Sequence, residues 1–165
     1  YLCRWPNHCA DMAIDTVLLA VGPMDTVRAP ELAETVLEIA EPLGANVVIG
    51  HAFTEDEYED VHDDLGFDAR VDDIDPDEVA AERAPVPELA ERFAEAGVDY
   101  EIKGALGEVS SKVVDMAIDV DADRMVVGGR RRSPAEKAVL GSVSQEIILS
   151  APCPVTYFRD LDVME

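Results

Sequence analysis

Short apolar runs alternate with amphipathic segments along the chain, and this alternation constrains the fold more than any other feature. Runs with the length and composition of buried strands occupy residues 16–21, 46–53, 98–103, 124–128 and 154–158. The intervening segments show helical spacing of apolar residues at 28–43, 77–96, 108–120 and 142–150. This order predicts an α/β, Rossmann-like fold: a five-stranded, mostly parallel sheet with helices on both faces and right-handed crossovers.

A chain of 165 residues fits one domain, which we place at residues 14–159. Residues 1–13 show no periodicity, so we predict a disordered extension outside the fold, and residues 160–165 form a short tail. Pro85 and Pro87 interrupt the second helical segment, so two helices are possible there.

The stretch from Glu55 to Glu82 departs from the alternating pattern. It holds fourteen Asp and Glu residues against a single base, Arg70. A composition of this kind is typical of a solvated, mobile excursion, and we assign an acidic insertion to residues 54–77.

Charge restricts the partners of this chain. It carries 36 Asp and Glu against 13 Lys and Arg, a formal net charge of −23. Nucleic acids and anionic membranes carry the same sign, so neither is expected as a partner. The acids are spread over nearly every predicted helix, which favours a surface adapted to high salt over a single cationic partner. No apolar run could span a membrane, and residues 1–13 lack a signal-peptide pattern, so we expect a cytoplasmic protein of a halophile.

Neither the cysteines nor the acidic stretch has the spacing of a metal site. Cys3, Cys9 and Cys153 include no C-x-x-C pair, so we predict reduced thiols without function, with Cys153 in the core. The segment Asp72–Asp77 lacks the central Gly and terminal Glu of an EF-hand loop, which leaves calcium binding a minor alternative.

Glycine, hydroxyl and basic residues are concentrated after the strand at 124–128. Gly128 and Gly129 follow this strand, Arg130–Lys137 holds four of the thirteen basic residues, and Gly141-Ser142 begins the last helix. Glycine lets the backbone approach a phosphate, and a helix N-terminus presents free N–H groups to it. The same residues also serve turns and helix caps, so an anion site and a purely structural loop are both open.

The end of the first strand, at Val21-Gly22, offers a second loop for the same site. In doubly wound sheets, ligands bind beyond the carboxyl ends of the strands, where the winding reverses. The two loops flank one crevice if the first and fourth strands are neighbours.

From Ile14 to Phe158 the chain resembles the universal stress protein family. The resemblance lies in Val17–Val21, His51–Phe53, Gly107–Val109, Ala151–Val155 and, most specifically, the glycines between residues 126 and 144. Nucleotide-binding members show Gly, two residues, Gly, nine residues, then Gly-Ser or Gly-Thr, and Gly128 and Gly141-Ser142 have the required separation. The resemblance implies strand order 3-2-1-4-5, and the acidic composition suggests a haloarchaeal type of member.

The resemblance also implies a non-catalytic stress-response protein that binds ATP, with Mg²⁺, or another adenine nucleotide. It implies a homodimer formed through the last strand, at Val155, Thr156, Tyr157 and Phe158. The implied nucleotide-binding positions are Ala20, Val21, Gly22, Ala52, Gly128, Arg131, Gly141, Ser142, Val143 and Ser144. Two of them depart from the family pattern, because Arg131 replaces the middle glycine and Gly22 replaces the Asp that usually ends the first strand. These departures predict weak or absent ATP binding.

The alternative is an enzyme, a nucleotide hydrolase or transferase, that uses the same crevice. Against it, His51 and His62 are the only histidines within the predicted domain, and neither is placed as a general base. His51 lies in a predicted buried strand, where we expect a core residue with satisfied hydrogen bonds.

Overall fold

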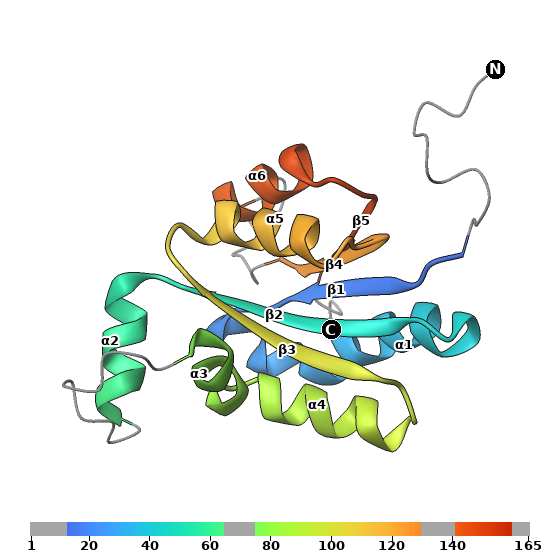
Figure 1. Cartoon of the computed structure of the whole chain (residues 1–165), viewed down its shortest axis with the longest axis horizontal. Coiled ribbons are helices and arrows are strands. Elements are labelled where there is room, and N and C mark those ends of the chain that lie inside the picture. The colour runs from blue at the N-terminus through green and yellow to red at the C-terminus, as the bar shows by residue number, and fades with distance from the viewer. Residues whose placement is uncertain (1–12, 65–74, 130–140, 160–165) are drawn as a thin grey trace, which may run out of the picture.

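The computed structural model describes residues 13–64, 75–129 and 141–159, and its centre is a parallel sheet of five strands (Figure 1). The strands are β1 (Thr16–Ala20), β2 (Asn46–Phe53), β3 (Tyr100–Leu106), β4 (Arg124–Gly128) and β5 (Val155–Phe158). Their order in the sheet is β3-β2-β1-β4-β5, and every neighbouring pair is parallel. The fold class and strand order predicted from the sequence are therefore confirmed.

Helices cover both faces of this sheet (Figure 1). The helices α1 (Ala29–Leu43) and α4 (Val86–Glu95) lie on one face, and α5 (Val109–Asp119) and α6 (Ser142–Ser150) lie on the other. A 3-10 turn, η1 (Pro23–Arg28), connects β1 to α1. Two further helices, α2 (Glu55–Asp64) and α3 (Pro76–Glu82), follow β2.

The two cores follow from the alternation of side chains along each strand. Val17 and Leu19 point to the core formed with α1 and α4, whereas Leu18 and Ala20 point to the core formed with α5 and α6. Because β1 is buried on both faces, its sequence is a continuous apolar run, as the sequence analysis assumed.

The centre of the sheet is the point where the winding reverses. From β1 the chain proceeds outward to β2 and β3, then returns to β4 on the other side of β1. β1 and β4 are paired in register, with Ala20 opposite Val127. The loops that follow these two strands therefore begin side by side at one edge of the sheet.

The acidic stretch is more ordered than the sequence analysis expected. Its two ends form α2 and α3, and in α3 the side chains of Val79 and Ala80 are fully buried against Phe53 of β2. This helix corresponds to the start of the helical segment predicted from residue 77, whereas α2 lies within the insertion assigned to residues 54–77, where no helix was expected. Residues 65–74 lie outside the described residues.

Two other boundaries also differ from the prediction. The second helical segment is divided into α3 and α4, as the prolines at 85 and 87 allowed. Strand β3 begins at Tyr100 and continues through Gly104 to Leu106, three residues beyond the predicted end at residue 103. The predicted extension, apart from Ala13, and the predicted tail fall outside the described part of the chain. None of the described helices has the length and apolar character needed to cross a membrane.

Candidate functional site

A cavity of about 280 Å³ opens at the carboxyl ends of β1 and β4. Its walls come from both of these strands, η1, the end of β2, the first turns of α5 and the N-terminus of α6. Its volume is close to the lower end of the range for small-molecule sites. Its described lining is Ala20, Val21, Gly22, Pro23, Met24, Asp25, Arg28, Ala52, Glu57, Val109, Val113, Val127, Gly128, Gly141, Ser142, Val143, Ser144 and Ile147.

The structure brings together every described residue that the sequence analysis selected. Nine of the ten selected positions line this cavity: Ala20, Val21, Gly22, Ala52, Gly128, Gly141, Ser142, Val143 and Ser144. The tenth, Arg131, lies outside the described residues, as do Arg130–Lys137. The convergence follows from the pairing of β1 with β4, on which the predicted crevice depended.

The N-terminus of α6 supplies backbone donors to the cavity. Gly141 is the N-cap residue and has no side chain with which to cap the helix. The first N–H groups of a helix lack partners within the helix, and together with the helix dipole they favour an anion. Because Ser142, Val143 and Ser144 form the first turn of α6 and line the cavity, this helix end is suited to an anionic group.

The adjacent glycines at the end of β4 each leave room for a different side chain. A Cβ on Gly128 would lie 2.7 Å from Oδ1 of Asp25, so a side chain at this position would displace that carboxylate. A Cβ on Gly129 would lie 1.8 Å from the hydroxyl oxygen of Tyr157 in β5. Gly129 is therefore explained by its contact with the edge strand and does not substitute for the missing middle glycine of the loop.

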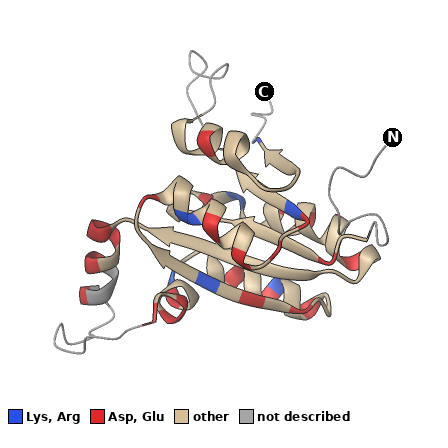
Figure 2. Cartoon of the chain, turned by 45° about the horizontal axis from the view of Figure 1, so that its top comes forward, with Lys and Arg blue, Asp and Glu red and all other residues tan. Residues whose placement is uncertain are grey.

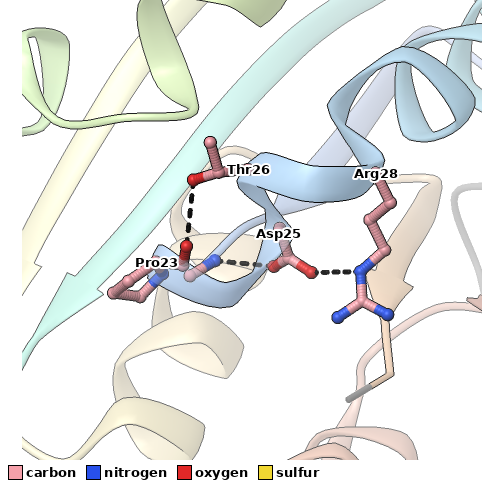
Figure 3. A network of polar contacts seen from close by, with 5 residues as sticks. Pro23, Asp25, Thr26 and Arg28 are labelled. Atoms are coloured by element: carbon pink, nitrogen blue, oxygen red, sulfur yellow. Dashed lines mark hydrogen bonds and ion pairs between the residues drawn. The ribbon is translucent and has the colours of Figure 1, made fainter. Parts of the chain in front are cut away.

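The turn η1 places a buried ion pair at the cavity, which Figure 3 shows from close by. The backbone N–H of Gly22 donates to Oδ2 of Asp25 at 2.7 Å, and Nε of Arg28 donates to Oδ1 of the same carboxylate at 2.7 Å. The side chains of Arg28 and Asp25 are 7% and 9% exposed. Asp25 thus brings a carboxylate back to the end of β1, where Gly22 has none.

A sequence model of the universal stress protein family matches residues 13–159 of this chain. The chain belongs to the universal stress protein family. A universal stress protein of Thermus aquaticus is 32% identical over 145 residues, which cover 87% of this chain and 98% of the relative. A universal stress protein of Mycolicibacterium smegmatis is 34% identical over 76 residues, which cover 46% of this chain and only 58% of the relative's length.

Solved universal stress proteins share this fold at low sequence identity. A universal stress protein in complex with cAMP has a TM-score of 0.61 and 20% identity, with 90% of this chain and 99% of the other covered. For a universal stress protein of Archaeoglobus fulgidus in complex with dAMP the TM-score is 0.54 and the identity 20%, with 87% and 96% covered. An Arabidopsis thaliana family protein with AMP bound has a TM-score of 0.56 and 15% identity, with 90% and 93% covered.

Several cavity residues of this universal stress protein were missed by the sequence analysis. The most important are Asp25, which lies between a predicted strand and a predicted helix, and Arg28, the first residue of that predicted helix. An acid and a base three residues apart, directly after a buried strand, could have indicated them. The apolar contributions of Met24 and of α5 could not be located without the packing of the helices.

His51 does not meet the expectation of a satisfied core residue. It is buried, but its Nδ1 has no hydrogen-bond partner within the described residues. Burial lowers the pKa of its imidazole below the ordinary value. Successive residues of a strand point to opposite faces, so with Ala52 on the cavity wall His51 points away from the cavity, against the ring of Phe53.

Two further expectations concern thiols and metals. Cys153 is half-buried rather than fully buried, and burial raises the pKa of its thiol to about 11, so its reactive thiolate is scarce at neutral pH. The described residues contain no group of three or more His, Cys, Asp or Glu side chains that could hold a metal ion.

Proposed function

We propose that this universal stress protein binds an adenine nucleotide in the cavity at the ends of β1 and β4, and that it does so without catalytic turnover. The observation that carries the proposal is the convergence of nine residues, selected from the sequence as nucleotide-binding, on one cavity. The cavity combines apolar walls for a base with the uncapped N-terminus of α6 for a phosphate.

The solved relatives support the choice of ligand. Family structures with cAMP, dAMP and AMP have the same fold as this chain, and all three ligands are adenine nucleotides. ATP with Mg²⁺ is the larger ligand that the family's glycine pattern suggests. Mg²⁺ would enter with ATP, because this ion is usually held by substrate phosphates together with one or two protein carboxylates.

A homodimer, a cytoplasmic location and a halophilic, haloarchaeal type of source belong to the same proposal. The dimer would form through the outer edge of β5, because an unpaired strand edge favours association with another chain. Adenine nucleotides are abundant in the cytoplasm. Figure 2 shows Asp and Glu distributed over the helices with few Lys and Arg between them, an arrangement that supports a surface for high salt.

Calorimetric titration in molar KCl tests the nucleotide proposal. The titrants are AMP, cAMP and ATP with Mg²⁺, and the variant is Val143→Trp. Val143 lines the cavity and is 41% exposed, so a larger side chain there should fill the cavity without disturbing the packing of the core. The matched control is Leu149→Trp, because Leu149 lies on the same helix, is 76% exposed and does not line the cavity.

We expect binding to the wild type and to Leu149→Trp, and loss of binding in Val143→Trp. If no adenine nucleotide binds the wild type, the proposed function is wrong. Steady release of phosphate from ATP that Val143→Trp abolishes would instead favour the enzymatic alternative, a nucleotide hydrolase or transferase.

A further inference from the structure

Arg28 is the only cationic side chain among the described residues that line the cavity. The chain as a whole has 13 Lys and Arg against 36 acids, so a buried arginine at this place needs an explanation. Removing two charges from water is costly, and a buried pair is often no more stabilising than apolar residues of the same size. Stability of the fold is therefore a weak reason for placing Asp25 and Arg28 in the cavity wall.

The two side chains differ in how many of their polar atoms are hydrogen-bonded. Both carboxylate oxygens of Asp25 are used, one by the N–H of Gly22 and one by Nε of Arg28. Arg28 uses Nε alone, and no partner for its terminal nitrogens is found in the described part of the chain. Figure 3 shows these two nitrogens without a marked contact, with Nε alone joined to Asp25. A guanidinium held through Nε keeps its terminal fork available, and this fork matches the oxygens of a phosphate.

The position of the pair relative to the backbone fits the same ligand. A Cβ on Gly128 would lie 2.7 Å from Oδ1 of Asp25 and 3.3 Å from Nε of Arg28, so the pair rests against the bare end of β4. Gly128 and the first turn of α6 line the same cavity. Arg28 thus supplies the side-chain cation of a cavity whose backbone already favours an anion.

Resting on the proposed function, we infer that Arg28 is the specificity-determining residue that selects ligands carrying a phosphate group. Its terminal guanidinium nitrogens hold the phosphate. Asp25 is a positioning residue, which fixes the guanidinium through Nε and is itself fixed by the backbone of Gly22. The site accordingly discriminates a nucleotide from its nucleoside.

The test compares adenosine with AMP, by calorimetric titration at one fixed KCl concentration, in the wild type and in Arg28→Gln. A glutamine amide nitrogen falls near the position of arginine Nε, so this variant retains a donor for Asp25 and removes only the terminal nitrogens. Arg28→Lys keeps the charge without the fork. Arg92→Gln is the matched control, because Arg92 pairs with Glu88 on α4 and does not line the cavity.

We expect the wild type and Arg92→Gln to bind AMP about ten- to a hundredfold more tightly than adenosine, the value of one or two charge-assisted hydrogen bonds. In Arg28→Gln the ratio of the two dissociation constants should fall to within about threefold of one, with Arg28→Lys between them. Adenosine affinity itself should not change. Because both ligands are measured on the same preparation, a partly unfolded variant leaves the ratio intact, and a merely structural role for Arg28 would not alter it.

An unchanged ratio in Arg28→Gln overturns the inference and leaves the proposed function standing. If neither AMP nor adenosine binds the wild type, the proposed function fails, and inorganic pyrophosphate then decides the role of Arg28. If pyrophosphate binding is lost in Arg28→Gln and kept in Arg92→Gln, the inference that Arg28 selects phosphate groups is supported. If pyrophosphate does not bind the wild type either, the inference about Arg28 is also overturned.

Discussion

The two edges of the sheet have the same exposed backbone but different surroundings. At the β3 edge, Asp99 and Gly107 bond through their backbone to β2, so by alternation the N–H of Gly104 points outward. This N–H donates to Oδ1 of Asp77 in α3 at 2.6 Å. The first residue of α3, Pro76, lies so close that a Cβ on Gly104 would be 1.9 Å from its carbonyl oxygen. The acidic stretch thus covers part of this edge within the chain.

The β5 edge has no comparable cover in the described residues. The carbonyls of Pro154 and Phe158 accept hydrogen bonds from the β4 side, so the N–H groups of Val155 and Tyr157 point outward. All four residues of β5 are half-buried. Open edges invite pairing with another chain, and proteins usually cover or interrupt them. The acidic insertion therefore has a structural role at one edge, whereas the other edge is open, within the described residues, to the second subunit proposed above.

The largest effect on stability is expected from Gly104→Ala, which introduces a side chain at the covered edge. The added methyl would meet the backbone of Pro76, which cannot move aside without displacing α3. We expect a loss of about 3 kcal/mol in the free energy of unfolding, at the upper end for overpacking. Urea unfolding at fixed KCl measures it. A loss below about 1 kcal/mol would mean that α3 does not rest on this strand.

Breaking the open edge should have a large effect on assembly and a smaller one on the protomer. Val155→Pro removes an outward N–H while leaving the ladder to β4 intact, so the proposed dimer should become a monomer. Light scattering coupled to gel filtration measures the mass. The matched control, Thr156→Pro, removes an inward N–H and should instead destabilise β5. A dimer that persists in Val155→Pro, or a monomeric wild type, would contradict assembly through this edge.

Asp77→Ala tests the hydrogen bond that Asp77 of α3 accepts from the covered edge. Removing the carboxylate leaves the N–H of Gly104 without its acceptor, and we expect a loss of about 1–2 kcal/mol in the free energy of unfolding, since the pair is partly exposed. Glu78→Ala, an exposed acid in the first turn of the same helix, controls for charge and helix dipole. Equal losses in the two variants would assign the effect to charge alone.

Much of this fold was predictable, because burial leaves a clear periodic signal. The bounds of β2, β4 and α6 agree with the sequence prediction. The strand order required the family resemblance. A helix was predicted from residue 77, but its contact with the β3 edge was not, because that contact depends on how Pro76 and Asp77 are placed in three dimensions.

The candidate site was predictable where it depends on the backbone and not where it depends on side-chain pairing. Positions at strand and helix ends follow from the topology, and the nine selected residues that converge on the cavity, five of them Gly or Ser, lie at such ends. Asp25 and Arg28 meet only because η1 turns the chain back toward Gly22. That turn has no apolar periodicity, so the pattern that predicted the helices could not predict it.

The smallest effect is expected from Gly129→Ala, the counterpart of Gly104→Ala beside the open edge. Here the added Cβ would lie 1.8 Å from the hydroxyl oxygen of Tyr157, the far end of a side chain that can rotate away. We expect a loss of about 1 kcal/mol or less in the free energy of unfolding. In a Tyr157→Val background the ring is absent, so Gly129→Ala should then cost nothing, and a double-mutant cycle isolates the contact. If Gly129→Ala costs the same in both backgrounds, or as much as Gly104→Ala, the two edges do not differ in the way that their contacts indicate.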